Sequence, residues 1–370
     1  MNDLSNHTKC PTKEIDAKPR AVLRSQPEDF IVEEIPAYEA SGEGEHLFVT
    51  FRKTGITTIQ AVEQLAAALD IDPRTAGRAG LKDRHAITTQ TVSLPFPIAR
   101  GDEPESLLAG LASEPLEVLG CKRHLNKLKP GHLKGNRFRI TLRGLPAEAT
   151  ETLAAAFHTL AHVPNGFGAQ RFGARGDNAE RALSWVRGEW RGPRQRGKQK
   201  LLFSALQSKL FNEVLARRVA EGTHANVIEG DLVKKLESGG MFLVSAQDLD
   251  NTRQRAQSGE LCATGPMFGA KMRWPEGPAQ QLEEEILAAA ALSRDDLKRF
   301  KAAGAGTRRP FLLPIAQRSA EARPAEGVLV VSFVLPKGGY ATTVLSEICH
   351  LEDAKKAEGQ DQAPPPSMGI

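Results

Sequence analysis

Short runs of apolar and β-branched residues, bounded by Gly or Pro, recur through the first part of the chain and again near its end. Runs of this kind are typical of β-strands. The pattern predicts strands over residues 21–35, 46–51, 90–94, 116–121, 138–142 and 328–335.

Helical spacing of apolar residues interrupts these strands. Thr57 or Thr58 can cap a helix that runs to about residue 69. One face of this helix is predicted to carry Ile59, Val62, Leu65 and Ala66. Residues 149–161 form a second amphipathic segment. Strands and helices together indicate an α+β fold for the first half of the chain.

From about residue 165 the pattern becomes helical, with predicted helices over residues 177–190, 201–220 and 281–303. The strand pattern resumes after about residue 310, so the chain leaves its first domain and returns to it, as an insertion does. We therefore expect one domain from residues 21–161 and 310–351, and an inserted domain over residues 162–309. The polar ends, residues 1–20 and 352–370, are expected to be disordered.

Composition is that of a globular protein of about two domains, with 370 residues of which 40% are hydrophobic. A formal net charge of +4 is only mildly basic, so a nucleic-acid partner must be attracted by a local patch. The four cysteines stand far apart without a Cys-x-x-Cys pair, which indicates a reducing compartment. No apolar run reaches membrane-spanning length and no signal peptide is recognisable, so we expect a cytoplasmic protein.

Two basic tracts are candidates for binding RNA. The first, residues 122–143, contains no Asp or Glu and carries Lys122, Arg123, Lys127, Lys129, Lys134, Arg137, Arg139 and Arg143. Such a tract can replace counterions along a phosphate backbone, and we favour RNA contact over a merely solvated face. The second tract, residues 187–200, contains Glu189 and is rich in Gly and Gln. Its pattern indicates a mobile loop, either RNA-binding or solubilising.

One carboxylate stands among cations directly after a glycine, in the segment Gly80-Leu81-Lys82-Asp83-Arg84. Glycine allows a tight turn or a close approach of the backbone to a ligand. The flanking Lys82 and Arg84 favour an ionised carboxylate and attract phosphate. This suits a nucleophile or base that acts on a polyanion, although Asp in a polar turn is by itself more often a turn former.

This segment resembles the signature of the TruD family of tRNA pseudouridine synthases, and further motifs of that family follow in order along the chain. They read PEDFIVEEIP at residues 27–36, GEGEHL at 42–47, KLK and GHLKGNRF within 127–138, PN at 164–165, GAQRFG at 168–173, ALQSKLFN at 205–212, GPMFG at 265–269 and LPKGGYAT at 335–342. Their combination in this order is specific, whereas each piece alone is modest.

The resemblance implies a catalytic domain with a mixed, mainly antiparallel sheet, interrupted by an inserted α+β TRUD-type domain, with RNA received between the two. It also implies conversion of uridine to pseudouridine at position 13 of certain tRNAs. That reaction breaks the glycosidic bond to N1, turns the uracil and rejoins C1′ to C5, so it needs no redox partner or group donor. We expect tRNA as the partner, no cofactor or metal, and a monomer.

The resemblance also assigns roles around the active site. Asp83 would either attack the anomeric carbon or remove the neighbouring 2′ proton, and both routes require an ionised carboxylate. Arg24 would keep Asp83 ionised and aimed. Phe138 would stack on the target base, Asn136 would help to fix the aspartate loop, and Phe30 would line the pocket. From local pattern alone, Phe30 and Phe138 are core residues and Arg24 a strand-surface charge.

Contacts to RNA are expected from a further group of polar side chains. They are Lys82, Arg84, Lys127, Lys129, Lys134, Gln170 and Arg171. For Gln170 and Arg171, near the expected domain junction, a packing role is the alternative.

Other chemistries fit less well. Cys121, His124 and His132 have no regular second ligand pair and lie among repelling cations, which argues against zinc. No Gly-x-Gly-x-x-Gly follows a strand and no Walker loop is present, which argues against dinucleotide and nucleoside triphosphate binding. The main alternative is a non-catalytic RNA-binding or RNA-folding protein, which would share the basic tracts but would not need Asp83.

Overall fold

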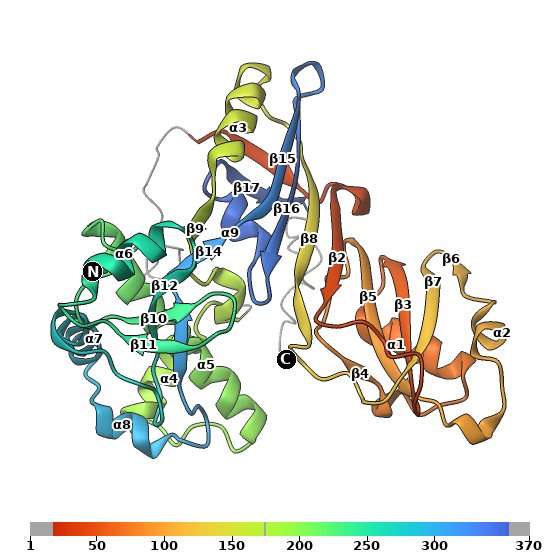
Figure 1. The fold of residues 1–370 in the computed structure, drawn as a ribbon, viewed down its shortest axis with the longest axis horizontal. Coiled ribbons are helices and arrows are strands. Elements are labelled where there is room, and N and C mark those ends of the chain that lie inside the picture. Colours follow the sequence, from red (N-terminus) through yellow and green to blue (C-terminus); the bar gives the residue numbers. More distant parts are fainter. Residues whose placement is uncertain (1–17, 174, 355–370) are drawn as a thin grey trace, which may run out of the picture. The chain divides into compact units, whose positions relative to one another are not determined.

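The computed structural model describes residues 18–173 and 175–354 and divides them into two compact units. One, here called the sheet unit, consists of residues 18–161 and 314–354. The other, the inserted unit, consists of the described residues between 162 and 313. The two units can be followed by colour in Figure 1, where the chain leaves the sheet unit after α3 (Ala147–Thr159) and returns to it at β14 (Leu312–Pro314).

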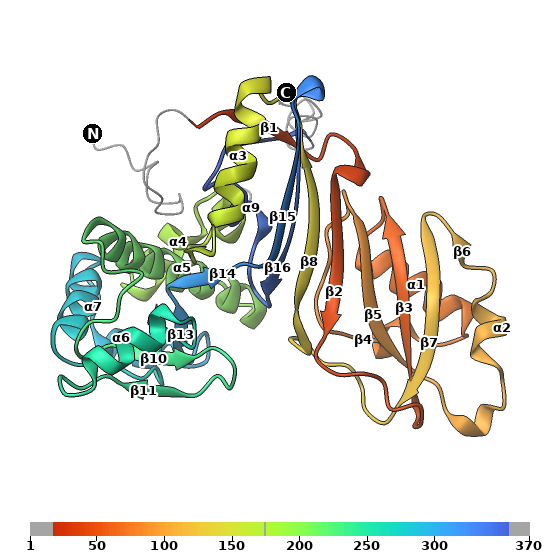
Figure 2. The same ribbon diagram turned by 45° about the horizontal axis from the view of Figure 1, so that its top comes forward.

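A mixed sheet of nine strands forms the body of the sheet unit. Eight of them lie side by side in the order β15 (Ala316–Arg323), β16 (Val328–Pro336), β8 (Leu133–Leu142), β2 (Phe30–Pro36), β5 (Ile87–Pro95), β3 (His46–Thr54), β7 (Leu116–His124) and β6 (Ala112–Ser113), and β4 (Gly77–Arg78) pairs with β5. Every pairing is antiparallel except that of β2 with β5. Figure 2 shows these strands fanned out edge to edge.

Helices cover parts of this sheet. Helix α1 (Thr58–Ala68) buries Val62 and Leu65 in a core shared with Val49 and Phe51 of β3. Helix α3 packs on β15 and β16, and the ring centres of Phe157 and Phe333 are 5.6 Å apart there. Two shorter helices, α2 (Pro104–Leu108) and α9 (Ala341–Leu345), complete the unit. The alternation of apolar residues correctly predicts that this part of the chain forms a sheet.

The predicted first strand, residues 21–35, is wrong as a single element. Strand β1 (Arg20–Leu23) ends before Arg24, whose backbone is left-handed with φ of 61°. A 3₁₀ helix over Pro27–Asp29 precedes β2. Proline cannot donate to a strand ladder and its fixed φ suits the first position of a helical turn, which explains the interruption.

Ile59 does not lie on the buried face of α1, contrary to the prediction, and is 51% exposed. Thr58 takes the inward position. Its hydroxyl donates to Gln90 Oε1 over 2.8 Å and accepts the backbone N–H of Lys82 over 3.0 Å. A polar residue is buried here because it binds the aspartate segment.

The predicted chain-end tails are too long. Strand β1 pairs in parallel with β17 (His350–Asp353), and this pairing places Leu23 opposite Asp353. Residues 18–20 and 352–354, assigned to the tails from sequence, are thus part of the ordered sheet unit. The rest of both predicted tails lies outside the described residues.

The inserted unit contains an antiparallel four-stranded sheet surrounded by helices. Its strand order is β11 (Met241–Leu243), β10 (Leu232–Lys235), β12 (Leu261–Met267) and β13 (Thr307–Pro310). The helices are α4 (Asn178–Val186), α5 (Arg196–Ala220), α6 (Leu249–Gln257), α7 (Gly277–Ala289) and α8 (Arg294–Arg299). Strand β9 (His162–Pro164) pairs with β14 at the base of the unit.

Two predicted elements differ here. The helix expected over residues 281–303 is divided into α7 and α8, and Ala291, with φ of 50°, lies at the break. The mobile loop expected over residues 187–200 is partly helical, because α5 begins at Arg196.

Candidate active site

Side chains from the sheet hold the aspartate segment in place. Residues 80–86 have no regular secondary structure, and the Asp83 side chain is 58% exposed. Lys53 Nζ donates to the backbone carbonyl of Asp83 over 2.7 Å and to that of Ile56 over 2.8 Å. Arg84 Nε donates to the Gly55 carbonyl over 3.0 Å. Asp83 is therefore an accessible carboxylate on a loop that is held in place by the hydrogen bonds of Lys53 and Arg84.

Lys53 is a fully buried lysine on β3. Strand alternation turns it toward the same side as Val49 and Phe51, into the interior. Burial lowers the pKa of its ammonium group to about 8, while the nearby Asp83 opposes that shift. Its two carbonyl partners supply the acceptors that a buried ammonium group requires.

Lys82 points into the sheet unit rather than toward solvent. Its Nζ lies 3.0 Å from Glu34 Oε2 and donates to Asn136 Oδ1 over 2.5 Å. Glu34 and Asn136 are directly opposed on β2 and β8, and the Lys82 and Glu34 side chains are only 7% and 4% exposed. The burial of its charge against Glu34 argues against the expected role of Lys82 in binding phosphate. The geometry instead links Asn136 to the aspartate segment through Lys82.

Arg24 lies between two carboxylates. Its Nη1 is 3.5 Å from Asp83 Oδ2, and its Nη2 donates to Asp353 Oδ2 over 2.5 Å. The guanidinium carbon lies 5.0 Å from the centre of the Phe30 ring. With its side chain 11% exposed, Arg24 is not the strand-surface charge that the local pattern suggested.

Phe30 and Phe138 form an aromatic layer on one face of the sheet. They are 4% and 6% exposed, and their ring centres are 6.3 Å apart in an edge-on arrangement. Phe138 also stacks on Phe333 of β16 at 5.4 Å. One face of the Phe138 ring is thus filled by protein, and the core placement read from the local pattern describes this conformation.

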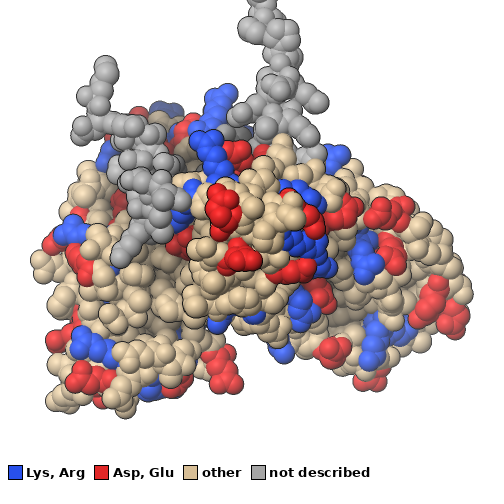
Figure 3. Space-filling view, turned by 90° about the horizontal axis from the view of Figure 1, so that it is seen from above, with Lys and Arg blue, Asp and Glu red and all other residues tan. Residues whose placement is uncertain are grey.

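The first basic tract divides into paired and unpaired cations. Arg123 donates to the carbonyls of Gly44 and Phe96. Arg137 forms an ion pair with Glu33. Arg143 donates two hydrogen bonds to the Asp29 carboxylate. Lys127, Lys129 and Lys134 are exposed. On the face seen in Figure 3, cationic and anionic side chains are interspersed rather than gathered into one basic field. The exposed lysines of the tract are cations in it that remain available to a polyanion.

The remaining predicted RNA contacts differ in their surroundings. Arg84 is exposed beside Asp83. Arg171 donates to Ser208 Oγ over 3.0 Å and lies over the Phe167 ring at 5.4 Å, which is the packing role weighed from sequence. The Gln170 side chain lies outside what the structure describes.

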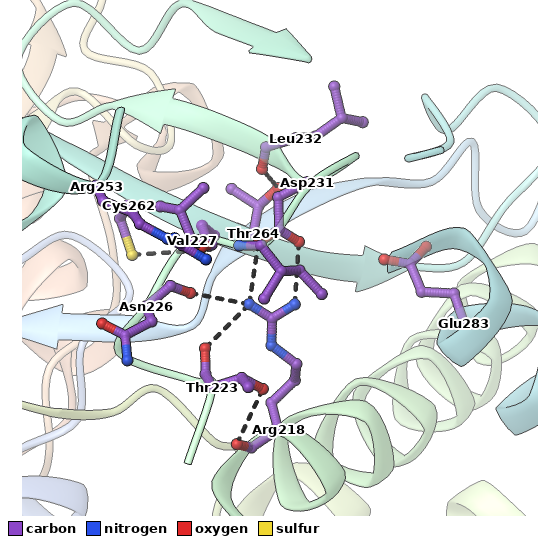
Figure 4. A network of polar contacts seen from close by, with 12 residues as sticks. Arg218, Thr223, Asn226, Val227, Asp231, Leu232, Arg253, Cys262, Thr264 and Glu283 are labelled. Atoms are coloured by element: carbon purple, nitrogen blue, oxygen red, sulfur yellow. Dashed lines mark hydrogen bonds and ion pairs between the residues drawn. The ribbon is translucent and has the colours of Figure 1, made fainter. Parts of the chain in front are cut away.

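A second buried polar cluster, in the inserted unit, is structural (Figure 4). Arg218 forks onto both oxygens of Asp231 over 3.1 and 3.0 Å and donates to the carbonyls of Thr223 and Asn226. The Arg218 and Asp231 side chains are 1% and 2% exposed. Both terminal nitrogens of Arg218 and both oxygens of Asp231 are thus occupied by contacts within the protein, which is a structural rather than a substrate-binding arrangement.

Two other kinds of site were sought in the described residues. No group of three or more His, Cys, Asp or Glu side chains there could hold a metal ion. Within the same residues, no helix is both long enough and apolar enough to cross a membrane.

Sequence reasoning did not single out Glu34, Lys53 or Asp353, and it named Thr58 only as a possible helix cap. Strand alternation could have identified Lys53, since it shares the inward phase of Val49 and Phe51. The role of Asp353 depends on the pairing of β1 with β17, for which the sequence offers no local signal.

The mixed, mainly antiparallel fold is that of a pseudouridine synthase. The chain belongs to the family described as tRNA pseudouridine synthase D (TruD), whose model matches residues 17–193 and 195–348. This confirms the resemblance drawn from the motifs.

Relatives and a solved structure agree over most of the chain. It is 43% identical over 331 residues to the tRNA pseudouridine synthase D of an Anaeromyxobacter species, covering 88% of this chain and 91% of the relative. It is 39% identical over 350 residues to that of Thermus thermophilus, covering 94% of each. A crystal structure from Methanosarcina mazei that carries the TruD name matches with a TM-score of 0.72 and 25% identity, covering 90% of this chain and 94% of that one. The expected mixed, mainly antiparallel fold is thereby confirmed.

Proposed function

We propose that this protein isomerises uridine to pseudouridine in tRNA, at position 13, with Asp83 as the catalytic carboxylate. Family membership supports the reaction, and the names of the relatives support tRNA as the substrate. The observation that carries the site is the accessible Asp83 carboxylate, 3.5 Å from the Arg24 guanidinium, on a loop anchored by Lys53.

The chemistry makes specific demands on these groups. The C1′–N1 bond breaks, the detached uracil turns, C1′ bonds to C5, C5 loses its hydrogen as a proton, and N1 takes up a proton from solvent, so the product has the same composition as the substrate. Asp83 acts in its ionised form, either on C1′ or on the 2′ proton. The Arg24 charge favours that form and limits the orientations that the carboxylate adopts.

The target uridine must leave its stack to reach Asp83, and aromatic side chains commonly receive such a base. Phe30 is the aromatic ring that lies under Arg24, and Phe138 adjoins it. We propose that these two rings bound the uracil site. Contact with the phosphate backbone falls to the exposed cations Arg84, Lys127, Lys129 and Lys134.

The remaining features complete the proposal. The predicted inserted domain, residues 162–309, extends the surface offered to tRNA, and Gln170 and Arg171 lie in its first part. We place the enzyme in the cytoplasm as a monomer, without metal or cofactor. The three cysteines in the described residues are free thiols, which supports a reducing compartment.

Mapping of the product tests this function. Unmodified tRNA transcripts that carry uridine at position 13 are incubated with enzyme, treated with a carbodiimide that marks pseudouridine, and read by primer extension. The proposal predicts a stop at position 13 with wild type and none with Asp83→Asn. Binding of tRNA without any pseudouridine at any position would favour the RNA-binding alternative.

A further inference from the structure

Arg24 carries two ion pairs of unequal character. The pair with Asp353 is short, 2.5 Å, and both side chains are largely buried, at 11% and 15% exposure. The pair with Asp83 is longer, 3.5 Å, and Asp83 is 58% exposed. Because buried charges interact more strongly than solvated ones, Asp353 and not Asp83 is the main electrostatic anchor of Arg24.

The backbone at Arg24 has an unusual conformation. Arg24 has φ of 61°, in the left-handed region that side chains other than glycine rarely adopt. Strained backbone of this kind persists where the surroundings determine it, and it is frequent at active sites. The Arg24 Nε is buried without a hydrogen-bond partner among the described residues, so the two terminal nitrogens make the contacts that fix the guanidinium.

We propose that Asp353 is a positioning residue for the isomerisation: it holds Arg24 at the distance and orientation from which Arg24 aims Asp83. This inference rests on the function proposed above. Asp353 engages one end of the guanidinium fork and leaves the other end for Asp83. If both ends of the guanidinium bound Asp83, they would restrain the carboxylate that must reach the substrate. If Asp353 were absent, the Arg24 side chain would be free to move away from Asp83.

The fold brings Asp353 to this position from the far end of the chain. Asp353 is the last residue of β17 and Arg24 directly follows the last residue of β1, and these strands run parallel with Leu23 opposite Asp353. The pairing of β1 with β17 thus places residue 353 beside residue 24, so the order of β17 is coupled to the geometry of the proposed active site.

A matched control lies on the same two strands. Arg20 and Glu352 form an ion pair of 3.1 Å with side chains 82% and 55% exposed. Their pair shares the β1–β17 register but faces solvent, so Glu352→Gln reports the effect of losing a carboxylate from β17 without touching Arg24.

The test is a double-mutant cycle on the rate of C5 tritium release from labelled tRNA. Asp353→Ala is expected to lower kcat by about 10-fold to 100-fold, since small displacements of catalytic groups have effects of that order. KM for tRNA should change less than about 2-fold, because the exposed lysines supply affinity. In an Arg24→Ala background the same substitution should lower kcat no more than about 2-fold, since the residue through which Asp353 acts is gone.

The outcomes separate the possibilities. Additive effects in the two backgrounds, or an Asp353→Ala rate equal to that of Glu352→Gln, would overturn the positioning role. Should Asp353→Ala fail to fold, the same cycle with Asp353→Leu, which fills a similar volume but offers no acceptor to Arg24, decides in the same way. No release by wild type would overturn the proposed function, whereas wild-type release with an unaffected Asp353→Ala overturns this inference alone.

Discussion

The buried pair between Glu34 and Lys82 makes a quantitative prediction about stability. At 3.0 Å, two unit charges attract by about 5 kcal/mol if the effective dielectric constant is about 20. Glu34→Gln removes the negative charge and leaves the Lys82 ammonium buried with only neutral amide oxygens, such as that of Asn136, as acceptors. Breaking one side of a buried pair costs about 3–5 kcal/mol. We expect Glu34→Gln to destabilise the sheet unit by that amount.

The neighbouring residue supplies the control. Glu33 pairs with Arg137 over 2.7 Å, but their side chains are 51% and 48% exposed. Glu33→Gln should therefore cost less than about 1 kcal/mol. Replacing both buried partners, with Glu34→Gln and Lys82→Met, should recover much of the loss, because no unpaired charge remains.

The assay must report the correct unit. All three tryptophans, Trp185, Trp190 and Trp274, lie in the inserted unit, so their fluorescence follows that unit. Native-state hydrogen exchange of the β2 and β8 amides follows the sheet unit. Glu34→Gln should lower protection of those amides and leave the tryptophan transition in denaturant unchanged. A loss below about 1 kcal/mol, equal to that of Glu33→Gln, would refute the reasoning that this pair is buried and coupled.

Three further predictions concern other charges. Lys53 has a pKa lowered to about 8 from 10.5, so the unfolded chain binds its proton more tightly and stability should rise between about pH 8 and 10.5. Denaturation midpoints of wild type relative to Lys53→Met should show this rise, and a flat difference would contradict it. Charge reversal of Lys127 and Lys129 should weaken tRNA binding and reduce its salt slope by about 2; an unchanged slope in filter binding would remove them from the RNA site. Arg218→Ala should destabilise the inserted unit by about 3–5 kcal/mol, with most recovered by Arg218→Met with Asp231→Leu; a tryptophan transition unchanged in Arg218→Ala would contradict this.

Strand and helix periodicity accounts for much of the fold. Alternation identifies β3 and β16 because half of their residues are buried in phase, and helical spacing identifies α1 and α5. The interruption between β1 and β2 escapes this reasoning, because apolar residues on both sides of it continue the strand pattern. Helical spacing also cannot show that Thr58 and not Ile59 is buried, because that choice depends on contacts with Gln90 and Lys82 from other parts of the chain.

The family motifs name residues of the candidate site, but they do not predict which way each side chain points. Family motifs led to Asp83, Arg24 and Asn136, which the structure links through direct contacts or through Lys82. Whether Lys82 faces solvent or the interior is not encoded in its position beside Asp83, because an irregular loop has no fixed side-chain phase. The contribution of Asp353 arises from pairing across almost the whole chain, which local pattern cannot reveal.

The role of Asp83 in isomerising uridine is tested most directly by the release of tritium from tRNA labelled at uridine C5. C5 loses its hydrogen only when the new bond to C1′ forms. With no added cofactor, we predict stoichiometric release by wild type and none by Asp83→Ala, while both proteins bind tRNA with similar affinity. Equal release by Asp83→Ala, or no release by wild type despite intact tRNA binding, would contradict it.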